Sequence, residues 1–487
     1  MPRSQIPLSR SLTPTRSRQF PYRLAPRSLP HTGDRAECGE RTGVVPRMDC
    51  TSTFSRHDDD TKCHVATNTE NVCRGYLSRR MDGGVTREYK PEGGVTHENT
   101  SLRVEQVDNV QTLYFRLDRN VRNVTCSKLF LGDKQEIKKT MLLARHSRVD
   151  LEEYINLLDT RRCAAFIQER GYIMHFLTEE EKNFPLAFSI LVHTEVELLE
   201  RLLRAIYRPQ NFYCIHIDAK IERKERAALE GIVGCFPNVF LASRSIRVAW
   251  GSFQVLEAEM VCLRDMWRHQ AWKYYINLAG QEFPLRTNYE LVRILQAMDG
   301  ANFVHSSFRG AKKAKWEGAP PIPHGLRKVM GAFHIVVNRG FVDYALHNQT
   351  AIALYNWCRH TKIPDEIFFN TLNHNPQLSI PGSYTGDPDD DFVKPHISRF
   401  KIWSVMHFSC DKFIRRVCIL GINQLPVLAR RPEFFANKFS LEHDPYAYDC
   451  MEELLYNQTR HQYLHDRSVN TCYYSSLWQY KYRVPGH

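Results

Sequence analysis

A strand–helix–strand pattern between residues 184 and 220 constrains the fold of this chain more than any other feature. Residues 187–193 form a short apolar run of the length of a buried strand, and residues 212–217 form another. Between them, apolar residues from 196 to 206 recur at helical spacing, with charged residues off that face. A Pro-Gln-Asn sequence at 209–211 ends the helix. The pattern predicts two parallel strands joined by a helix.

Polar residues stand at the ends of these two predicted strands. His193 ends the first strand, and Asp218 directly follows the second. Parallel strands present their carboxyl ends at one edge of the sheet, where open α/β sheets bind ligands. Both side chains are therefore candidate ligand contacts. The pattern is common, and a histidine at a strand end is often a satisfied core residue, so a purely structural role stays open.

Strands and helices continue to alternate as far as residue 300. The further elements that we expect are helices over 151–158, 164–170 and 221–233, a helix capped by Ser252, a helix over 289–298 capped by Asn288, and strands over 240–242 and 272–278. Such alternation predicts an α/β fold with a largely parallel sheet flanked by helices.

Composition divides the rest of the chain. Residues 1–50 are rich in Arg, Pro and Ser, and no acidic residue precedes Asp34. They predict a disordered basic N-terminus, with a transit peptide as the alternative. Residues 51–120 are polar and predict a stem or linker. We expect the folded domain over 121–460 and a C-terminal tail over 461–487.

The net charge of +12 suits an anionic ligand, a nucleic acid or a membrane surface. Much of the basic excess lies in the first 50 residues, and no basic helix or interleaved aromatic platform favours nucleic acid. We find no apolar run of the roughly 20 residues that cross a bilayer and no signal-peptide hydrophobic region.

Cysteines and glycosylation sequons point to an oxidising compartment. The 14 cysteines are spread over the chain, and none forms the close pairs of a zinc site. N-x-S/T sequons occur at Asn99, Asn123, Asn348 and Asn457. Scattered cysteines together with sequons favour a lumen in which disulfides form.

Five motifs, in unbroken order between residues 126 and 450, carry a resemblance to a known family. They are FYCIHIDAK, VAWGSFQVLEAE, INLAGQEFPLRTN, IPDEIFFNTL and FFANKF. The set resembles the core 2 and I-branching β-1,6-N-acetylglucosaminyltransferases. The resemblance implies a GT-A-like fold and a type II Golgi membrane enzyme that moves N-acetylglucosamine from its UDP donor to O-6 of a sugar, with inversion and without a metal.

The resemblance also implies four disulfides. The implied pairs are Cys126–Cys450, Cys163–Cys235, Cys214–Cys262 and Cys410–Cys418. An additional free thiol of the family corresponds to Ala279 and is absent. Six cysteines stay unassigned, namely Cys38, Cys50, Cys63, Cys73, Cys358 and Cys472. Because family members begin with one membrane span, we hypothesise that the span is missing or replaced in residues 1–50.

Glu366 matches the catalytic base of the family. A positioned carboxylate can take the proton of an acceptor hydroxyl as the hydroxyl attacks, and inversion follows if no covalent intermediate forms. From spacing alone, an acidic residue two positions after Pro364 is an ordinary first-turn helix residue. Arg415 and Lys438 match the basic residues that stabilise the UDP leaving group, although the neighbouring Arg416 is an alternative to Arg415.

The resemblance places His193 and Asp218 at the uridine and calls for no cofactor or metal. An Asp-x-Asp sequence occurs at 387–389, but it lies after the predicted base, and we interpret it as a solvated acidic loop. Trp403, Lys312 and Lys315 match acceptor contacts.

Two other acceptor positions carry valine, at 304 and 405. Polar groups that would hold galactose are therefore partly missing, which leaves the identity of the acceptor sugar open.

The expected function is transfer of N-acetylglucosamine to a glycoprotein O-glycan, most simply the core 2 acceptor Galβ1-3GalNAc. The expected partners are a UDP-sugar, the O-glycan acceptor and the Golgi membrane. We expect no nucleic-acid partner. The alternatives are a related enzyme with another donor or acceptor, such as an I-branching or xylosyltransferase-like enzyme, and a catalytically silent carbohydrate-binding protein.

Overall fold

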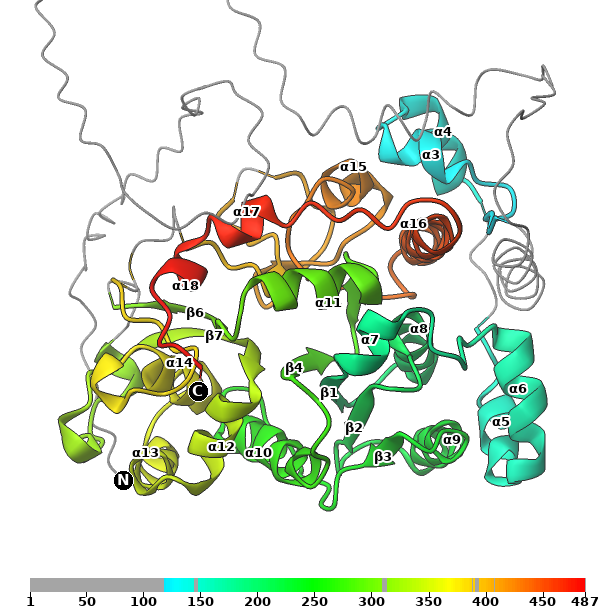
Figure 1. The fold of residues 1–487 in the computed structure, drawn as a ribbon. Helices are drawn as coiled ribbons and strands as arrows, with labels where there is room; N and C mark the ends of the chain where they lie inside the picture. Colours follow the sequence, from blue (N-terminus) through cyan, green and yellow to red (C-terminus); the bar gives the residue numbers. More distant parts are fainter. Residues whose placement is uncertain are drawn as a thin grey trace, which may run out of the picture. The chain divides into compact units, whose positions relative to one another are not determined.

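The computed structural model describes residues 118–143, 148–308, 313–387, 389, 394–406 and 408–486 (Figure 1). The predicted basic N-terminus, most of the predicted stem, Asn99 and Lys312 lie outside these residues. Along the described chain, no helix is both long enough and apolar enough to cross a bilayer.

A six-stranded sheet in the order β3-β2-β1-β4-β7-β6 forms the centre of the fold. Its strands are β1 (Leu186–Val192), β2 (Phe212–Ile217), β3 (Val239–Leu241), β4 (Tyr274–Ala279), β6 (Phe303–Ser307) and β7 (Met330–Asn338). β1 pairs in parallel with β2 and β4, and β2 pairs in parallel with β3, while β7 is antiparallel to both of its neighbours. The predicted α/β fold with a largely parallel sheet is confirmed.

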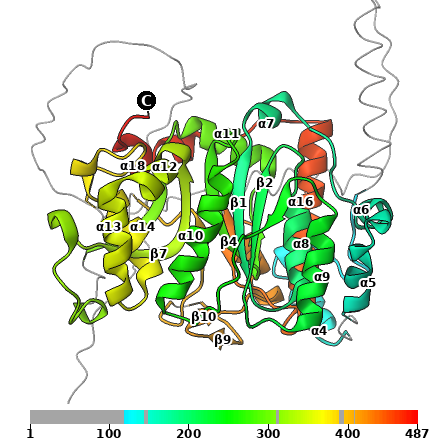
Figure 2. The same ribbon diagram turned by 90° about the horizontal axis from the view of Figure 1, so that it is seen from below.

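Side chains of the central strands alternate between two apolar layers. In β1, Phe188 and Ile190 enter one core cluster, whereas Ala187 enters the other. The first layer contains α8 (Val196–Ile206), α9 (Arg223–Gly234) and α11 (Asn288–Ala297). The second contains α10 (Phe253–Trp267), α12 (Arg339–His347), α13 (Gln349–Trp357) and α14 (Phe368–Asn373). Figure 2 shows α8 and α9 on one side of β1 and β2, with α10 and α13 on the other. Burial on both faces explains why the strands are continuous apolar runs.

The predicted cap of α11 is wrong by one residue. Thr287 is the N-cap: its hydroxyl accepts from the backbone N–H of Glu290, and the Glu290 carboxylate accepts from the N–H of Thr287. This capping box follows from the Thr-x-x-Glu spacing. Asn288 is the first helical residue, and its side chain instead hydrogen bonds Asn211 and Glu181.

The described chain also forms a smaller three-stranded sheet, in the order β5-β11-β8, and a hairpin of β9 and β10. These strands are β5 (Glu282–Pro284), β8 (Arg399–Phe400), β9 (Phe413–Ile414), β10 (Val417–Cys418) and β11 (Phe435–Asn437). The remaining α-helices of the described residues are α3 (Cys126–Phe130), α4 (Lys134–Met141), α5 (Leu151–Ile155), α6 (Cys163–Arg170), α7 (Glu179–Asn183), α15 (Leu425–Leu428), α16 (Pro445–Leu464), α17 (Cys472–Ser475) and α18 (Trp478–Lys481), and short 3₁₀ helices lie between them.

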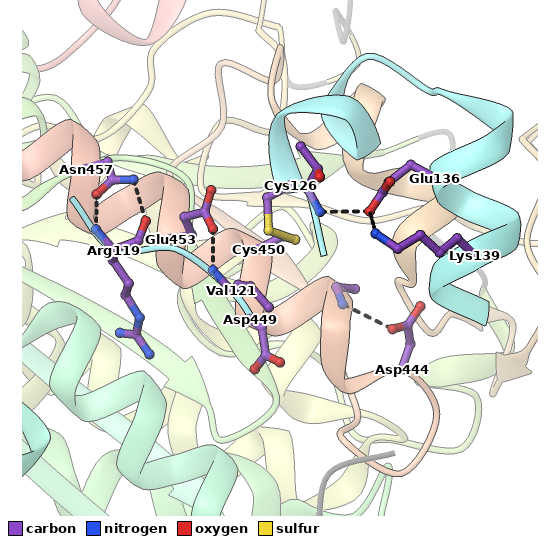
Figure 3. The surroundings of a disulfide bond; sticks show 12 residues. Arg119, Val121, Cys126, Glu136, Lys139, Asp444, Asp449, Cys450, Glu453 and Asn457 are labelled. Atoms are coloured by element: carbon purple, nitrogen blue, oxygen red, sulfur yellow. Dashed lines mark hydrogen bonds and ion pairs between the residues drawn. A yellow bond between two sulfur atoms is a disulfide. The ribbon is translucent and has the colours of Figure 1, made fainter. Parts of the chain in front are cut away.

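All four predicted disulfides are present in the structure. Cys126–Cys450 joins α3 to α16 across 324 residues. Figure 3 shows this bridge beside hydrogen bonds from Arg119 to Asn457 and from Val121 to Glu453. The bridge therefore belongs to a broader attachment of the first described residues to α16. Of the unassigned cysteines, Cys358 is a buried thiol without a disulfide partner.

The segment predicted as a C-terminal tail is folded against the rest of the unit. α16 continues to Leu464, and α17 and α18 follow it. Tyr474 and Leu477 are buried in the first core layer. The backbone N–H of Gly382 donates to the carbonyl of Val484 at 2.9 Å. The apolar residues of this segment therefore belong to the core.

Candidate active site

The predicted donor contacts meet at the carboxyl edge of the central sheet. β1 connects to β2 on one side, whereas β4 lies on its other side, so the topological switch point of the sheet is at β1. Burial and the positive charge of Lys220 lower the pKa of His193, with smaller contributions from Lys438 and Arg415. These electrostatic interactions show that the predicted uridine contact and both predicted phosphate contacts lie near one another.

Asp218 is buried and held as a carboxylate at this edge. It forms an ion pair with Lys220, accepts from the Lys220 backbone N–H at 3.0 Å, and accepts from that of Val248 at 3.3 Å. Burial raises the pKa of Asp218, but Lys220 and these backbone donors outweigh burial and leave the pKa below its usual value. Asp218 therefore anchors the segment that leads to Trp250.

His216 anchors the same segment and was not singled out from the sequence. Its Nε2 accepts from the backbone N–H of Ile246 at 2.9 Å. Burial lowers the pKa of His216 to about 4, although Asp218 acts in the opposite direction. The neutral imidazole is thus a structural hydrogen-bond acceptor. The sequence signal for this role is a polar residue inside the apolar run of β2, because a buried polar side chain needs a hydrogen-bond partner.

Arg415 lies in the two-residue loop of the β9–β10 hairpin. Its φ is 50° and that of Arg416 is 68°, the left-handed conformation that tight hairpin turns require. Non-glycine residues in this region are strained and cluster at functional sites. The Arg415 guanidinium lies 5.3 Å from the ring centroid of Trp250, which is 64% exposed. Cys410–Cys418 closes the loop that carries both arginines.

Lys438 directly follows β11 and is partly buried. Its Nζ lies 3.4 Å from Gln281 Oε1, and Gln281 in turn donates to Glu195 at 2.6 Å. Burial, followed by the charge of Arg415, lowers the pKa of Lys438. Two cations that repel each other at the carboxyl edge of an α/β sheet form a site suited to an anion.

Glu366 ends the short 3₁₀ helix Pro364–Glu366 and contacts Lys315. Lys315 Nζ lies 3.2 Å from Glu366 Oε2, so two predicted site residues meet. The preceding Asp365 is 6% exposed, and burial followed by the charge of Glu366 raises its pKa to about 7. The N–H of Ile363 donates to the carbonyl of Gly251, next to Trp250. The predicted base is thereby tied to the segment that packs on Arg415.

Trp403 is exposed and lies beside the β9–β10 hairpin. The two segments form a β-bridge between Trp403 and Val417, and the N–H of Ser404 donates to the carbonyl of Arg416 at 2.8 Å. Val405 is 69% exposed, whereas Val304 is buried in the second core layer. Val304 therefore presents no side chain to a ligand, and Val405 presents an apolar one.

The acidic loop at 387–389 is not entirely solvated. Asp387 is exposed, but Asp389 is partly buried and accepts from Ser307 Oγ at 2.5 Å and from the N–H of Phe308 at 2.7 Å. Asp389 thus binds the end of β6. Within the part of the chain that the structure describes, no group of three or more His, Cys, Asp or Glu side chains is placed to hold a metal ion.

The three described sequons differ in accessibility. Asn123 is exposed. Asn348 caps α13 by accepting from the N–H of Thr350 at 2.9 Å. Asn457 is 8% exposed, and its amide both accepts from and donates to the backbone of Arg119 (Figure 3). The folded chain therefore presents Asn123 far better than Asn457 to a modifying enzyme.

The described chain thus combines an α/β sheet, two neighbouring cations suited to an anion, and a carboxylate paired with a lysine as a candidate base. The chain belongs to the family described as Core-2/I-Branching enzyme, whose model matches residues 186–429.

Three curated relatives support this assignment. Two are named beta-1,3-galactosyl-O-glycosyl-glycoprotein beta-1,6-N-acetylglucosaminyltransferase. The one from Bos taurus is 36% identical over 367 residues, which cover 68% of this chain and 85% of the relative. The one from Homo sapiens is 35% identical over 370 residues, with the same shares covered. A relative from Danio rerio, which carries that name followed by the number 4, is 34% identical over 409 residues, 78% of this chain and 90% of its own length.

Proposed function

We propose that this chain is a β-1,6-N-acetylglucosaminyltransferase that moves N-acetylglucosamine from UDP-GlcNAc to O-6 of an O-glycan sugar, with Galβ1-3GalNAc as the acceptor. Membership of the Core-2/I-branching family and the names of the curated relatives support this activity. The observation that carries it is the Glu366–Lys315 pair, which is tied through Gly251 and Trp250 to the cation site of Arg415.

The proposed reaction is a single displacement with inversion. The acceptor O-6 attacks the anomeric carbon of the donor sugar while the bond from that carbon to the UDP oxygen breaks. Glu366 takes the O-6 proton, and Lys315 orients the carboxylate from 3.2 Å. A positioned general base of this kind contributes about 100- to 10,000-fold in rate. With one carboxylate acting on the nucleophile, the configuration at the anomeric carbon inverts.

The electron pair of the broken bond leaves with UDP as negative charge on its phosphate. We propose that Arg415 and Lys438 stabilise that charge, and the lowering of the Lys438 pKa by the charge of Arg415 supports this pairing. The strained hairpin fixes Arg415, and the Gln281–Glu195 pair fixes Lys438, so little reorganisation is needed during the reaction. We propose that these cations supply the positive charge and that no metal is required. His193 and Asp218 are the proposed uridine contacts.

The setting of the reaction follows from the same family. We propose a GT-A-like fold, a glycoprotein acceptor and a Golgi location with a type II anchor; the four disulfides fit an oxidising lumen. The buried Val304 and the exposed apolar Val405 favour a second candidate on the acceptor side. This candidate is a related transferase with another acceptor, as in I-branching or xylosyltransferase-like enzymes.

The test is transfer of labelled N-acetylglucosamine to Galβ1-3GalNAc by the full chain, produced in a secretory host and assayed in EDTA. We expect transfer by the wild type and a fall in kcat of about 100- to 10,000-fold for Glu366→Gln. Calorimetry should give equal UDP affinity for both proteins. The exposed Glu317 provides a matched control, Glu317→Gln, which should retain full activity.

Each result separates one part of the proposal from another. Full activity of Glu366→Gln would exclude Glu366 as the base. Loss of wild-type activity in EDTA with recovery on adding Mn²⁺ would contradict the metal-free step. Transfer to other sugars but not to Galβ1-3GalNAc would favour the second candidate.

A further inference from the structure

Lys401 is a partly buried lysine between β8 and Trp403 that neither the motifs nor the proposed reaction uses. Its Nζ lies 3.1 Å from His334 Nδ1 and 5.7 Å from the ring centroid of Trp403. An ammonium group carries three donor hydrogens. Within the described residues, the contact to His334 is the only hydrogen bond of this group, which leaves two of its donor hydrogens without a protein partner.

A chain of buried groups fixes the ammonium. Lys401 can only donate, so His334 Nδ1 accepts and the imidazole proton is on Nε2, which faces Glu282 Oε1 at 2.6 Å. Burial, followed by the charge of Lys401, lowers the pKa of His334 to about 3, so the ring is neutral. Glu282 accepts from Arg399 Nε at 2.8 Å and from Asn437 Nδ2 at 3.0 Å. Strands β5, β7, β8 and β11 therefore all support the position of Lys401.

The charged groups around Lys401 include the predicted base. Burial, with a smaller contribution from the charge of Arg399, lowers the pKa of Lys401 to about 8. The negative charges of Glu282, Glu366 and Asp365 act in the opposite direction. The ammonium is thus charged at neutral pH. Its charge interacts with that of Glu366, and its position next to Trp403 puts it beside a residue that is a proposed acceptor contact.

We propose that Lys401 is a specificity-determining residue, whose two available donors bind an oxygen of the acceptor sugar that packs on Trp403. The inference rests on the proposed function. Exposed aromatic rings bind the apolar faces of sugars, and an adjacent fixed donor then selects which sugar and which orientation bind. Val405 offers no hydrogen bond and Val304 is buried, so Lys401 supplies a polar contact that these positions do not.

The experiment is a double-mutant cycle between Lys401→Met and monodeoxy forms of the acceptor. Methionine keeps the length of the side chain and removes the donors. We expect kcat/KM for the intact acceptor to fall about 10- to 100-fold, as for a hydrogen bond to a charged group. One deoxy position should cost the wild type a similar factor and cost Lys401→Met little, while the other positions cost both proteins equally.

Controls separate recognition from folding. The exposed Lys412, in the same part of the chain, provides the matched variant Lys412→Met, which should behave as wild type. The UDP affinity and KM for UDP-GlcNAc of Lys401→Met should be unchanged. If Lys401→Met does not fold, the pH dependence of the acceptor KM, measured for the wild type and for Lys401→Arg, tests the inference instead. The wild-type acceptor KM should rise above a pH of about 8 as the ammonium loses its proton, and arginine should abolish that rise because it stays charged.

Three results would overturn the inference. They are equal kinetics for Lys401→Met and Lys412→Met, additive effects at every deoxy position, and a wild-type acceptor KM that is constant through this pH range. Failure of the wild type to transfer any sugar would instead refute the proposed function, so the two failures are distinguishable.

Discussion

Acidification should loosen the segment that leads to Trp250, because His216 is a neutral hydrogen-bond acceptor for that segment. Its Nε2 accepts from the N–H of Ile246 at 2.9 Å, and the carbonyl of Ile246 accepts from the N–H of Ala219 at 3.1 Å. A protonated imidazole has no lone pair to accept this bond. Protonation would therefore break the contact and place a charge within the buried edge of the sheet.

The magnitude follows from the pKa difference between the folded and unfolded chain. The pKa of His216 is about 4 in the fold, against 6.5 for an unperturbed histidine. Between these values the unfolded state binds more protons, so the free energy of unfolding falls as the pH falls. This one group should cost about 1.4 kcal/mol at a pH near 5.5 and about 3 kcal/mol near pH 4. Above a pH of about 7, it costs almost nothing.

Equilibrium denaturation with the disulfides intact measures this effect, at pH values of about 7.5, 6.5 and 5.5. In His216→Gln, the side-chain carbonyl can accept from Ile246 and does not titrate. The loss of stability between the highest and lowest pH should therefore be about 1.3 kcal/mol smaller in this variant than in the wild type. His360→Gln, at an exposed position, should follow the wild type. Parallel pH curves for wild type and His216→Gln would refute the reasoning.

Two further predictions concern the proposed phosphate contact Arg415 and a disulfide. Arg415→Ala should weaken UDP binding about 10-fold or more, as expected for loss of a charged contact, whereas Arg416→Ala should have a much smaller effect. Calorimetry on both variants measures the UDP affinity. The reverse order of effects would assign the phosphate contact to Arg416 instead of Arg415. Replacing Cys163 and Cys235 by serine opens a loop of 72 residues and should lower the free energy of unfolding by about 4 kcal/mol in the chain-entropy model, which a denaturation midpoint measured beside the wild type would test.

The local parts of this fold could be predicted from the sequence, whereas its long-range contacts, apart from the four disulfides, could not. β1 and β2 were predictable because strands buried on both faces are continuous apolar runs. The disulfides followed from the resemblance. Lys401 was missed because its partner His334 is 67 residues away and the two meet only when separate sheets assemble. Lys315 meets Glu366 across 51 residues through a different contact, in which the N–H of Lys362 donates to the carbonyl of Lys315.

Glu282 joins the two halves of the proposed site through one buried carboxylate. One oxygen accepts from Asn437, whose neighbour Lys438 is a proposed phosphate contact, and the same oxygen faces His334, which contacts Lys401. Burial raises the pKa of Glu282, but Arg399, His334 and further donors outweigh burial and lower the pKa to about 2. A buried carboxylate that stays ionised is costly unless every contact is kept. The network therefore ties the backbone next to Lys438 to the contacts of Lys401, and under the proposed roles it would hold the donor and acceptor cations in a fixed relation.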